Sequence, residues 1–553
     1  MKRTGAEIIV DQLCAQGVTT VFGYPGGAVL PLYDALYQNA QRIQHIITAH
    51  EQGAAHAADG YARISGKTGV VIATSGPGAT NLVTGIANAY LDSVPMVAIT
   101  GNVAVPLLGR DSFQEVDIAG ITQPVVKHNF VVREVEELEH ILQEAFRIAN
   151  SGRKGPVLVD VPKSVQTDVC ESASSLPKKT SALRTLPDLS EALRAIRQCK
   201  RPYIYAGGGV IAAGAEAELR ALSERLSAPV GLSMMGLTAM PADDPLNLGM
   251  CGMHGTYAAT VAQAECDLMI ALGVRFSDRA TGNVKEYRKG CTIIHVDIDW
   301  AEMGKNVASP IELCGDVKAV LASLLQALPP MGNDAWLARI EELKQQDVFP
   351  ASRDFTPQNI IESVNRFCQE DTVIATDVGQ HQMWTMLYYR FMQPRTLLTS
   401  GGLGTMGYGL GAAIGGSMAR GGQRTVLITS EGSFGMNLNE LATAVSQELP
   451  ILIVLLNNGV LGMVRQWQTM FFGERHSQST LNRKTDFVAL AKAFGAEGVA
   501  AADLKELEAA LQQLPEKGPV VIDCRIDADE MVFPMVPPGG TAHNILTRRN
   551  PHA

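Results

Sequence analysis

Two oxygen-bearing side chains, Glu431 and Asn458, lie just beyond two apolar runs, at residues 425–428 and 451–456. A helical pattern separates the two runs. Two parallel strands joined by a helix have both carboxyl ends on one edge of a sheet, where open α/β sheets bind ligands. A carboxylate oxygen and an amide oxygen there suit a hard cation such as Mg²⁺, which in turn holds phosphates. The spacing predicts a metal–phosphate site; the alternative is an ordinary βαβ unit with a polar turn.

The segment 430–458 resembles the metal–diphosphate signature of thiamine-diphosphate enzymes, which is Gly-Asp-Gly followed at a similar spacing by Asn-Asn. Here Ser430, Glu431 and Gly432 stand where that family has Gly-Asp-Gly. Glu keeps the charge but adds about 1.3 Å of reach, whereas Mg²⁺ needs near-octahedral oxygens at about 2.0–2.1 Å. Ser in place of Gly costs free energy if the turn needs a positive φ. We hypothesise that activity survives with a raised requirement for metal and cofactor.

Length and composition limit the class of protein. A chain of 553 residues predicts three or four domains at roughly 150 residues each. A net charge of −10 without a basic stripe argues against a nucleic-acid partner. The apolar runs are too short to cross a bilayer, and the amino terminus has no signal-peptide pattern. Nine scattered cysteines without a C-x-x-C pair favour free thiols in a reducing compartment. We expect a cytoplasmic protein with no membrane partner.

Apolar β-branched runs alternate with helical patterns along the chain. This alternation is typical of parallel sheets covered by helices on both faces. We expect an α/β protein with three doubly wound parallel-sheet domains, at residues 1–165, 188–328 and 350–530, and a mobile C-terminal tail at 531–553. Polar segments at 168–187 and 327–334 would link the domains. The expected strands include residues 20–23, 69–74, 94–100, 156–161, 203–206, 268–271, 292–297, 372–376 and 520–524.

An internal repeat relates the first and third of these domains. Residues 71–102 and 426–458 both run through a strand, Thr-Ser, a Gly-containing turn, an Asn, a helix, a Pro and a strand. At one offset of 355 residues, Thr74 corresponds to Thr429 and Ser75 to Ser430. Convergent α/β patterning is the alternative explanation. We predict that the two domains share a fold.

Glu51 opens a helix of small residues at 54–62. A Glu in a first helical turn can simply complement the helix dipole. Beside a thiamine-diphosphate site it has a further use, because the proton on thiazolium C2 is removed by the cofactor's own amino group. That group becomes a base when a carboxyl hydrogen-bonds the pyrimidine N1′, and an apolar pocket keeps such a carboxyl readily protonated.

Over nearly its whole length the chain resembles the acetohydroxyacid (acetolactate) synthase catalytic large subunits. Ten dispersed stretches carry the resemblance: FGYPGGA (22–28), HEQGAAHAADGYAR (50–63), TSGPGATN (74–81), SFQEVD (112–117), VKHNF (126–130), GPVLVDVP (155–162), GVRFSDRATG (273–282), TDVGQHQMW (376–384), GLGTMGY (402–408) and LGMVRQW (461–467). One Gly-rich piece would be a weak signal, but ten in order are specific.

The resemblance implies roles for residues of the first domain. Glu51 would activate the cofactor, and the Gly27 amide would bind the substrate oxyanion. Phe113, Gln114 and Lys127 would approach a 2-keto acid substrate.

The resemblance also implies a site in the third domain. Met406 would lie between the two cofactor rings, although a Met is more often core filler. Mg²⁺ would be bound by Glu431, Asn458 and the Val460 carbonyl. Met463, Trp467 and Arg275 would bind the second keto acid. The remaining contacts to thiamine diphosphate would come from Val378, Gly379, Gln380, His381, Gly432 and Ser433.

For the middle domain the resemblance implies bound FAD in a structural, non-redox role. The stretch GVRFSDRATG is absent from the catabolic acetolactate synthases that lack FAD, and here it carries Ser277 where Asp is commoner. The expected FAD contacts are Gly208, Gly209, His254, Arg275, Asp297 and Asp316.

The reaction implied is the condensation of two pyruvates to 2-acetolactate with loss of CO₂, or of pyruvate with 2-oxobutyrate, in branched-chain amino-acid biosynthesis. The site would lie between the first domain of one subunit and the third domain of another, in a homodimer or homotetramer. A small regulatory subunit is typical of the family. Three alternatives stay open: a pyruvate oxidase, which would reduce its flavin; a glyoxylate carboligase, which usually lacks the Glu at 51; and a non-catalytic paralogue that assembles with an active homologue.

Overall fold

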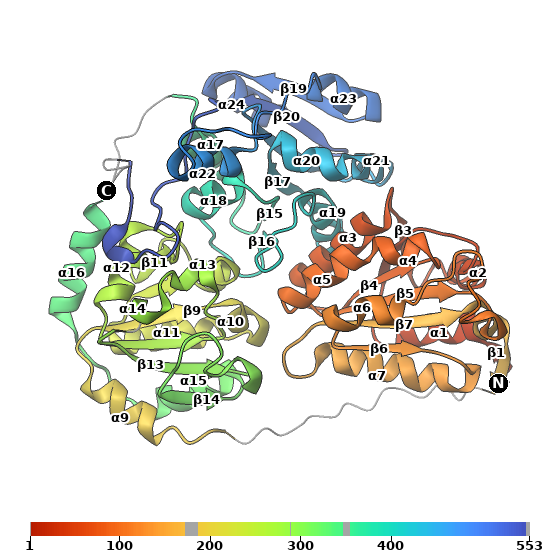
Figure 1. Cartoon of the computed structure of the whole chain (residues 1–553), viewed down its shortest axis with the longest axis horizontal. Helices are drawn as coiled ribbons and strands as arrows, with labels where there is room; N and C mark the ends of the chain where they lie inside the picture. Colours follow the sequence, from red (N-terminus) through yellow and green to blue (C-terminus); the bar gives the residue numbers. More distant parts are fainter. Residues whose placement is uncertain (1, 172–185, 288, 347–353, 549–553) are drawn as a thin grey trace.

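The computed structural model describes residues 2–171, 186–287, 289–346 and 354–548. Within these ranges the chain forms three domains, each built on a six-stranded parallel sheet with helices on both faces (Figure 1). The expected α/β class with three doubly wound sheets is therefore confirmed. The strands of the three sheets fall within 20–162, 202–314 and 373–525, while the predicted domain limits stay a prediction. Most of the expected linker at 168–187 lies outside the described residues.

The first domain, red to orange in Figure 1, has the strand order β3-β2-β4-β5-β7-β6. Its strands are β2 (Thr20–Gly23), β3 (Gln44–Ile47), β4 (Gly69–Ala73), β5 (Met96–Asn102), β6 (His128–Val131) and β7 (Pro156–Pro162). Its helices are α1 (Gly5–Ala15), α2 (Leu30–Gln38), α3 (Glu51–Ser65), α4 (Pro77–Asn81), α5 (Val83–Leu91), α6 (Ile118–Thr122), α7 (Leu138–Asn150) and α8 (Lys163–Thr167). A short antiparallel pair, β1 (Lys2–Thr4) with β8 (Val169–Glu171), ties the two ends of the domain together. Part of the expected linker is thus a strand.

The third domain, cyan to blue, repeats that order as β16-β15-β17-β18-β20-β19. Its strands are β15 (Val373–Thr376), β16 (Leu397–Leu398), β17 (Thr425–Thr429), β18 (Ile451–Asn457), β19 (Glu497–Ala501) and β20 (Val520–Arg525). Its helices are α17 (Pro357–Phe367), α18 (Gln380–Tyr388), α19 (Gly409–Ala419), α20 (Glu431–Asn437), α21 (Leu441–Ser446), α22 (Gly462–Phe471), α23 (Phe487–Phe494) and α24 (Leu504–Gln512). Taken in chain order, the strands of both domains are arranged identically, so the predicted shared fold is confirmed.

The middle domain, yellow to green, has the order β11-β10-β9-β12-β13-β14, which is the order of doubly wound dinucleotide-binding folds. Its strands are β9 (Pro202–Ala206), β10 (Val230–Leu232), β11 (Asn247–Met250), β12 (Leu268–Leu272), β13 (Thr292–Asp297) and β14 (Ile311–Cys314). Its helices are α9 (Ser190–Gln198), α10 (Gly208–Ala213), α11 (Glu216–Leu226), α12 (Tyr257–Glu265), α13 (Asp278–Thr281), α14 (Val284–Tyr287), α15 (Val317–Ala327) and α16 (Asp334–Gln345).

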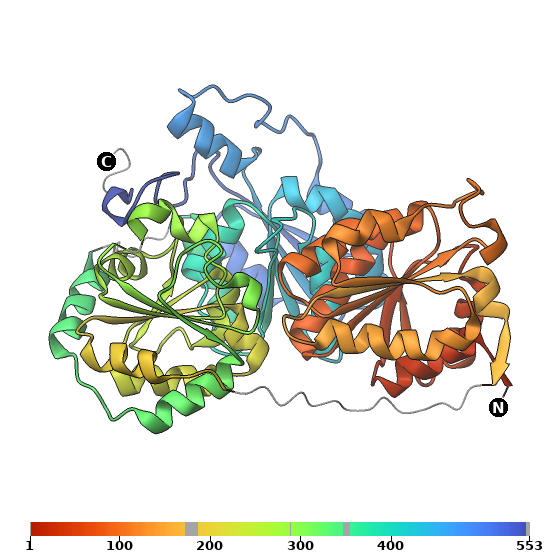
Figure 2. The ribbon, with the colours of Figure 1, turned by 60° about the horizontal axis from the view of Figure 1, so that its bottom comes forward.

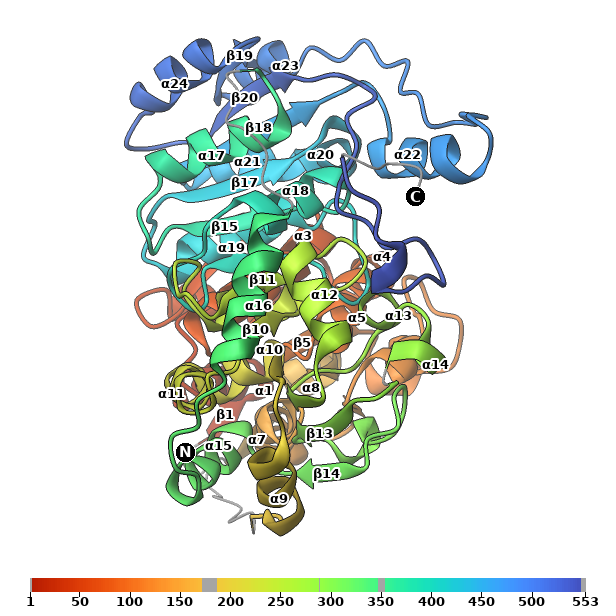
Figure 3. The same cartoon turned by 90° about the vertical axis from the view of Figure 1, so that its left-hand side faces the viewer.

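Helices α3 and α19 join the first and third domains by packing backbone against backbone. A Cβ at Gly60 would lie 2.3 Å from the Ala412 carbonyl oxygen, and one at Gly415 would lie 1.9 Å from that of Ala57. Side chains at either position would push the helices apart. The small residues of α3 therefore allow the close helix contact that joins the two related domains. Figures 2 and 3 show that the third domain contacts both of the others.

The described part of the C-terminal segment, up to residue 548, packs against the body of the protein instead of forming the expected mobile tail. Met535 and Leu546 exchange two backbone hydrogen bonds of 2.9 and 2.7 Å, and the Val536 amide donates to the Met253 carbonyl at 2.8 Å. Met535 is completely buried. The expectation is wrong for these residues because their apolar side chains close a small core with Met253 and Trp467.

Candidate active site

The third sheet changes direction between β15 and β17, since the chain continues from β15 to β16 on one side and from β17 to β18 on the other. Ligands of open α/β sheets bind outside the carboxyl ends of the strands at such a point. Helix α18 begins at Gln380 after β15, and its capping residue Gly379 has a φ of 153°. The first amides of a helix have no acceptor within the helix, so a helix start at this edge favours phosphate.

Glu431 follows β17 at the same edge and is 4% exposed. Within the described part of the chain neither of its carboxylate oxygens has a hydrogen-bond partner. Burial raises the pKa of Glu431 to about 7, and the nearby amides of Asn458, Gly459 and Val460 offset only part of that effect. An unpaired buried carboxylate is costly unless a cation compensates it. The described residues contain no group of three or more His, Cys, Asp and Glu that could hold a metal, so a cation here would rely on Glu431 with amide and carbonyl oxygens.

The neighbouring Ser430 has a φ of −132°, which is extended backbone. The strain expected from replacing a Gly at this position is therefore absent, because any residue adopts this conformation. Backbone strain at Ser430 therefore gives no reason for weaker metal binding, whereas the longer side chain of Glu431 still does.

A single cavity of about 1800 Å³ joins this edge to the middle domain. Most of the predicted third-domain and middle-domain site residues line it: Val378, Gly379, Gln380, His381, Met406, Asn458, Val460, Met463, Trp467, Gly208, Gly209, His254, Arg275, Asp297 and Asp316. Glu431, Gly432 and Ser433 lie next to this wall, where the Ser433 hydroxyl donates to the Val378 carbonyl at 3.0 Å.

Three polar atoms on buried residues of this wall have no partner among the described residues: Gln380 Oε1, His381 Nε2 and His254 Nδ1. Burial lowers the pKa of His381 to about 3 and that of His254 to about 4, so both rings are neutral at pH 7. Buried polar atoms without partners are rare in folded proteins. Their presence on one cavity wall indicates a site built for a polar ligand.

Arg275 and Trp467 face this cavity from different domains. Burial, helped by the nearby cation Arg153, lowers the pKa of Arg275, and among the described residues Arg275 forms no ion pair. The Trp467 ring lies 5.6 Å from the guanidinium of Arg279 and 5.6 Å from the Phe471 ring. A half-buried guanidinium that forms no ion pair among the described residues, such as that of Arg275, suits a small carboxylate substrate.

The middle-domain wall brings two glycine segments together. A Cβ at Gly209 would lie 2.5 Å from the Cα of Gly273, and the Gly209 amide donates to the Gly273 carbonyl at 3.1 Å. Asp297 ends β13, and burial raises its pKa. Asp316 caps α15 by accepting the Ala319 amide at 3.1 Å. Glycine backbone that no side chain covers, together with carboxylates that follow the strands, is the arrangement that binds dinucleotides.

The predicted first-domain residues are not among those that line the cavity. Glu51 starts α3 and is 8% exposed, and Asn81 Nδ2 donates to its Oε2 at 3.0 Å. Gly27 is exposed, and Phe113 is 87% exposed. Gln114 has a φ of +59° and lies tightly against Gly76. These residues instead follow β2, β3 and β5, at the carboxyl edge of the first sheet.

Lys127 has a different environment from the one expected. Its Nζ donates to the carbonyls of Ile148 and Ser151 at the end of α7. Burial lowers the pKa of Lys127 to about 8. Its role toward substrate stays a prediction.

Sequence reasoning missed three buried carboxylates that organise the site. Asp377 accepts the Gly409 amide at 2.8 Å and the Thr429 hydroxyl at 2.7 Å, which joins β15, β17 and α19. Glu440 reaches across to α3 and accepts the His50 amide at 2.9 Å. Asp92 accepts two loop amides of the third domain. Asp377 could have been found, because it ends an apolar strand just as Glu431 does.

Comparison with known proteins agrees with this arrangement. Three thiamine pyrophosphate enzyme domains match the chain: the N-terminal TPP binding domain at residues 3–121, the central domain at 189–324 and the C-terminal TPP binding domain at 377–524. Together they cover most of the chain, which belongs to the thiamine pyrophosphate enzyme family. It is a cofactor-dependent enzyme.

Particular relatives are similar over almost the whole chain. A probable acetolactate synthase large subunit of Methanocaldococcus jannaschii is 45% identical over 98% of this chain and 95% of the relative. The acetolactate synthase isozyme 2 large subunit of Escherichia coli is 45% identical over 98% of this chain and 99% of its own length. The acetolactate synthase large subunit of Lactococcus lactis is 43% identical over 97% and 95%. Within the described ranges, none of the helices has the length and apolarity for a bilayer crossing.

Proposed function

We propose that this chain is the catalytic large subunit of an acetolactate synthase. It decarboxylates pyruvate and joins the two-carbon unit to a second 2-keto acid, pyruvate or 2-oxobutyrate, for branched-chain amino-acid biosynthesis. One observation carries the proposal. Among the described residues the Glu431 carboxylate has no hydrogen-bond partner and Arg275 has no ion pair, and both border one cavity region in a chain that matches an acetolactate synthase over 98% of its length.

When bound, thiamine diphosphate supplies the nucleophilic carbon and the electron sink that decarboxylation of a 2-keto acid requires. Val378 to His381 would hold its diphosphate at the start of α18, with Gly432 and Ser433 alongside. Glu431, Asn458 and the Val460 carbonyl would hold Mg²⁺, and the orphaned oxygens of Glu431 fit that ion. Met406, whose Cε would lie 3.8 Å from a Cβ at Gly432, would set the angle between the cofactor rings.

Glu51 would exchange a proton with the pyrimidine nitrogen. The bond from Asn81 fixes one of its oxygens, and Gly78 leaves room beside the other, because a Cβ there would lie only 3.2 Å from Oε1. A carboxylate held in one orientation makes a better acid–base partner than a mobile one. Gly27 would donate its amide to substrate, and Gln114, Phe113 and Lys127 would complete this half of the site.

The second keto acid would bind between domains. Arg275 would pair with its carboxylate, and Trp467 with Met463 would limit the size of its side chain. The free-energy cost of burying the Arg275 guanidinium is offset when a substrate carboxylate binds next to it.

FAD would occupy the part of the cavity lined by the middle domain. Gly208, Gly209 and His254 fit its diphosphate region, and Asp297 and Asp316 fit its hydroxyl groups. We assign it a structural role with no redox step. The measurement that separates this from a pyruvate oxidase is flavin absorbance, which stays unchanged on adding pyruvate if FAD is structural and bleaches if it is not.

The functional unit would be at least a homodimer, with a homotetramer and a small regulatory subunit as further assemblies. The support is that Glu51 lies away from the cavity that holds the rest of the site. Large apolar side chains are also exposed at or near the first domain's site residues, including Phe113, Leu30 and Ile47. We place the enzyme in the cytoplasm, where the free thiols of all nine cysteines are stable.

The test is product analysis with the purified chain. With thiamine diphosphate, Mg²⁺ and FAD, pyruvate gives 2-acetolactate, and added 2-oxobutyrate gives 2-aceto-2-hydroxybutyrate, identified by mass spectrometry. A chain that binds its cofactors but forms neither product unless an active homologue is added is a non-catalytic partner, which contradicts the proposal.

A further inference from the structure

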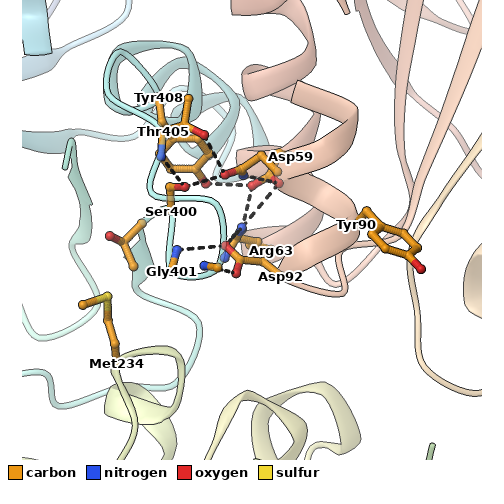
Figure 4. Close-up of polar contacts among 12 residues, drawn as sticks. Asp59, Arg63, Tyr90, Asp92, Met234, Ser400, Gly401, Thr405 and Tyr408 are labelled. Atoms are coloured by element: carbon orange, nitrogen blue, oxygen red, sulfur yellow. Dashed lines mark hydrogen bonds and ion pairs between the residues drawn. The ribbon is translucent and has the colours of Figure 1, made fainter. Parts of the chain in front are cut away.

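The loop that carries Met406 is held by the first domain of the same chain. This loop, residues 399–408, connects β16 to α19 and lines the cavity. Asp92 Oδ2 accepts the Gly401 amide at 3.0 Å, and its Oδ1 accepts the Gly402 amide at 2.7 Å (Figure 4). The Asp92 side chain is completely buried. Both of its oxygens therefore fix backbone at the start of the loop.

A second tie fixes the residue before Met406. The Ser400 hydroxyl donates to Asn88 Oδ1 at 2.5 Å and accepts the Thr405 amide at 2.9 Å. Asn88 lies on α5 and is completely buried. This short chain of bonds sets the position of Thr405 from the first domain.

A third tie lies just beyond Met406. Tyr408 donates its hydroxyl to Asp59 at 2.7 Å, and Asp59 pairs with Arg63 at 2.6 Å (Figure 4). Arg63 also pairs with Asp92 at 2.9 Å, and these carboxylates raise its pKa, so it remains a cation. Buried charges without partners are strongly destabilising. Here both carboxylates and the guanidinium are paired, which makes the network rigid.

We propose that Asp92, Asn88, Asp59 and Arg63 are positioning residues, a clamp that fixes Met406 for the active site of their own chain. The proposal rests on the shared site argued above, in which Glu51 serves the partner subunit's cofactor. Glu51 and Asp59 lie on the same helix, α3, about 12 Å apart along its axis. Helix α3 then serves two active sites: it activates one and shapes the other.

The first test needs no cofactor. In Ser400→Ala and Asp92→Asn, hydrogen–deuterium exchange at the amides of Gly401, Gly402 and Thr405 becomes at least ten-fold faster in the cofactor-free protein. The dissociation constant of thiamine diphosphate, read by fluorescence titration, rises roughly ten-fold, and kcat falls by at least as much. Ser400→Ala leaves the buried charges intact, so it separates the clamp from a general folding defect.

Asp160→Asn is the matched control, because Asp160 is a buried first-domain carboxylate whose bonds to Thr100 and Asn102 stay within its own domain. It leaves exchange in the loop unchanged. The proposal is overturned if Ser400→Ala and Asp92→Asn leave exchange, cofactor affinity and kcat at wild-type values, or if Asp160→Asn changes them equally.

The second test uses mixed dimers purified with two affinity tags. A dimer of one Glu51→Gln chain and one Asp92→Asn chain regains about half the wild-type activity, because one site has an intact clamp in its own chain and an intact Glu51 from the other. A dimer of one Glu51→Gln chain and one Glu431→Gln chain tests the shared site alone. It also regains about half the wild-type activity, because one of its two sites has an intact Glu431 from one chain and an intact Glu51 from the other.

The outcomes separate the two ideas. If the second mixture is active and the first is not, the clamp does not act on its own chain's site, and the proposal falls while the shared site stands. If neither mixture regains activity, the shared site falls as well.

Discussion

The carboxyl edges of the first and third sheets have the same strand order but opposite surroundings. In the third domain, Glu431 is buried next to the wall of a large cavity, and its carboxylate has no hydrogen-bond partner among the described residues. In the first domain, Glu51 is held by Asn81, and the neighbouring Phe113 is 87% exposed. Two domains with the same strand order therefore present unlike carboxyl edges. Under the proposed function they would be two half-sites, one for the charged end of the cofactor and one for its ring.

Glu51→Gln should give the largest effect, because it removes the proton acceptor of the ring half-site. We expect kcat to fall about 10²–10⁴-fold, with the affinity for thiamine diphosphate and Mg²⁺ nearly unchanged. Steady-state kinetics and cofactor titration measure both. Glu137→Gln, on the exposed surface of the same domain, is the control. Equal loss of cofactor affinity would show that Glu51 belongs to the binding half instead.

Glu431→Gln should act on the other half-site and abolish tight Mg²⁺ binding. The pKa of Glu431 is raised to about 7, and only its deprotonated form binds metal. Mg²⁺ affinity should therefore fall as the pH drops below about 7, by up to roughly ten-fold per pH unit, and level off above it. Calorimetric titrations at pH 6 and pH 8 check this. Metal affinity that is independent of pH in the wild type would remove Glu431 from the site.

Glu431→Asp isolates side-chain reach from charge. The shorter side chain should bind Mg²⁺ more tightly and lower the cofactor concentration needed for half-maximal activity. The same calorimetric titration decides the matter. If affinity and rate both stay at the wild-type values, the extra methylene of Glu431 is neutral.

Gly60→Ala should weaken the contact that joins the two half-site domains within a chain. The new Cβ would lie 2.3 Å from the Ala412 carbonyl, and such overpacking lowers the free energy of unfolding by about 1–3 kcal/mol. Urea denaturation measures it. Gly332→Ala, where a Cβ meets nothing within 4 Å, is the control. A stabilised Gly60→Ala variant would contradict the packing of α3 on α19.

Ser430→Gly should give the smallest effect. Because Ser430 already has extended backbone, a Gly relieves no strain and only adds freedom to the unfolded chain, which costs about 0.4–1 kcal/mol. Mg²⁺ affinity should not change. Tighter metal binding in this variant would mean that Ser430 does distort the site.

Much of the fold follows from local sequence. The predicted strands at 20–23 and 292–297 coincide with β2 and β13, because each is an apolar run. The limits of β5 were harder to predict: it starts at Met96 and extends through Gly101 and Asn102. Those two residues have no strand signal, and they extend the strand because they pair with Val161 and Pro162 of β7.

The site was predictable where chemistry sits at strand ends and unpredictable where it depends on distant contacts. Glu431 and Asn458 follow apolar runs, so their position at the carboxyl edge of the sheet could be predicted from the sequence. Asp92 looks like an ordinary polar helix end, and only the fold brings it to Gly401, 309 residues away. The substrate role of Lys127 stays a prediction, but the contacts of its ammonium with the Ile148 and Ser151 carbonyls at the end of α7 were not predictable. Its surroundings depend on tertiary packing that no local pattern records.

The most direct test of the two half-sites is a crystal structure of the protein with thiamine diphosphate, Mg²⁺ and FAD. We predict the metal on Glu431 and Asn458, the diphosphate at the start of α18, and the pyrimidine ring against Glu51 of the partner subunit. A ring contacting Glu51 of its own chain, or a metal bound elsewhere with Glu431 still unpaired, would contradict the account.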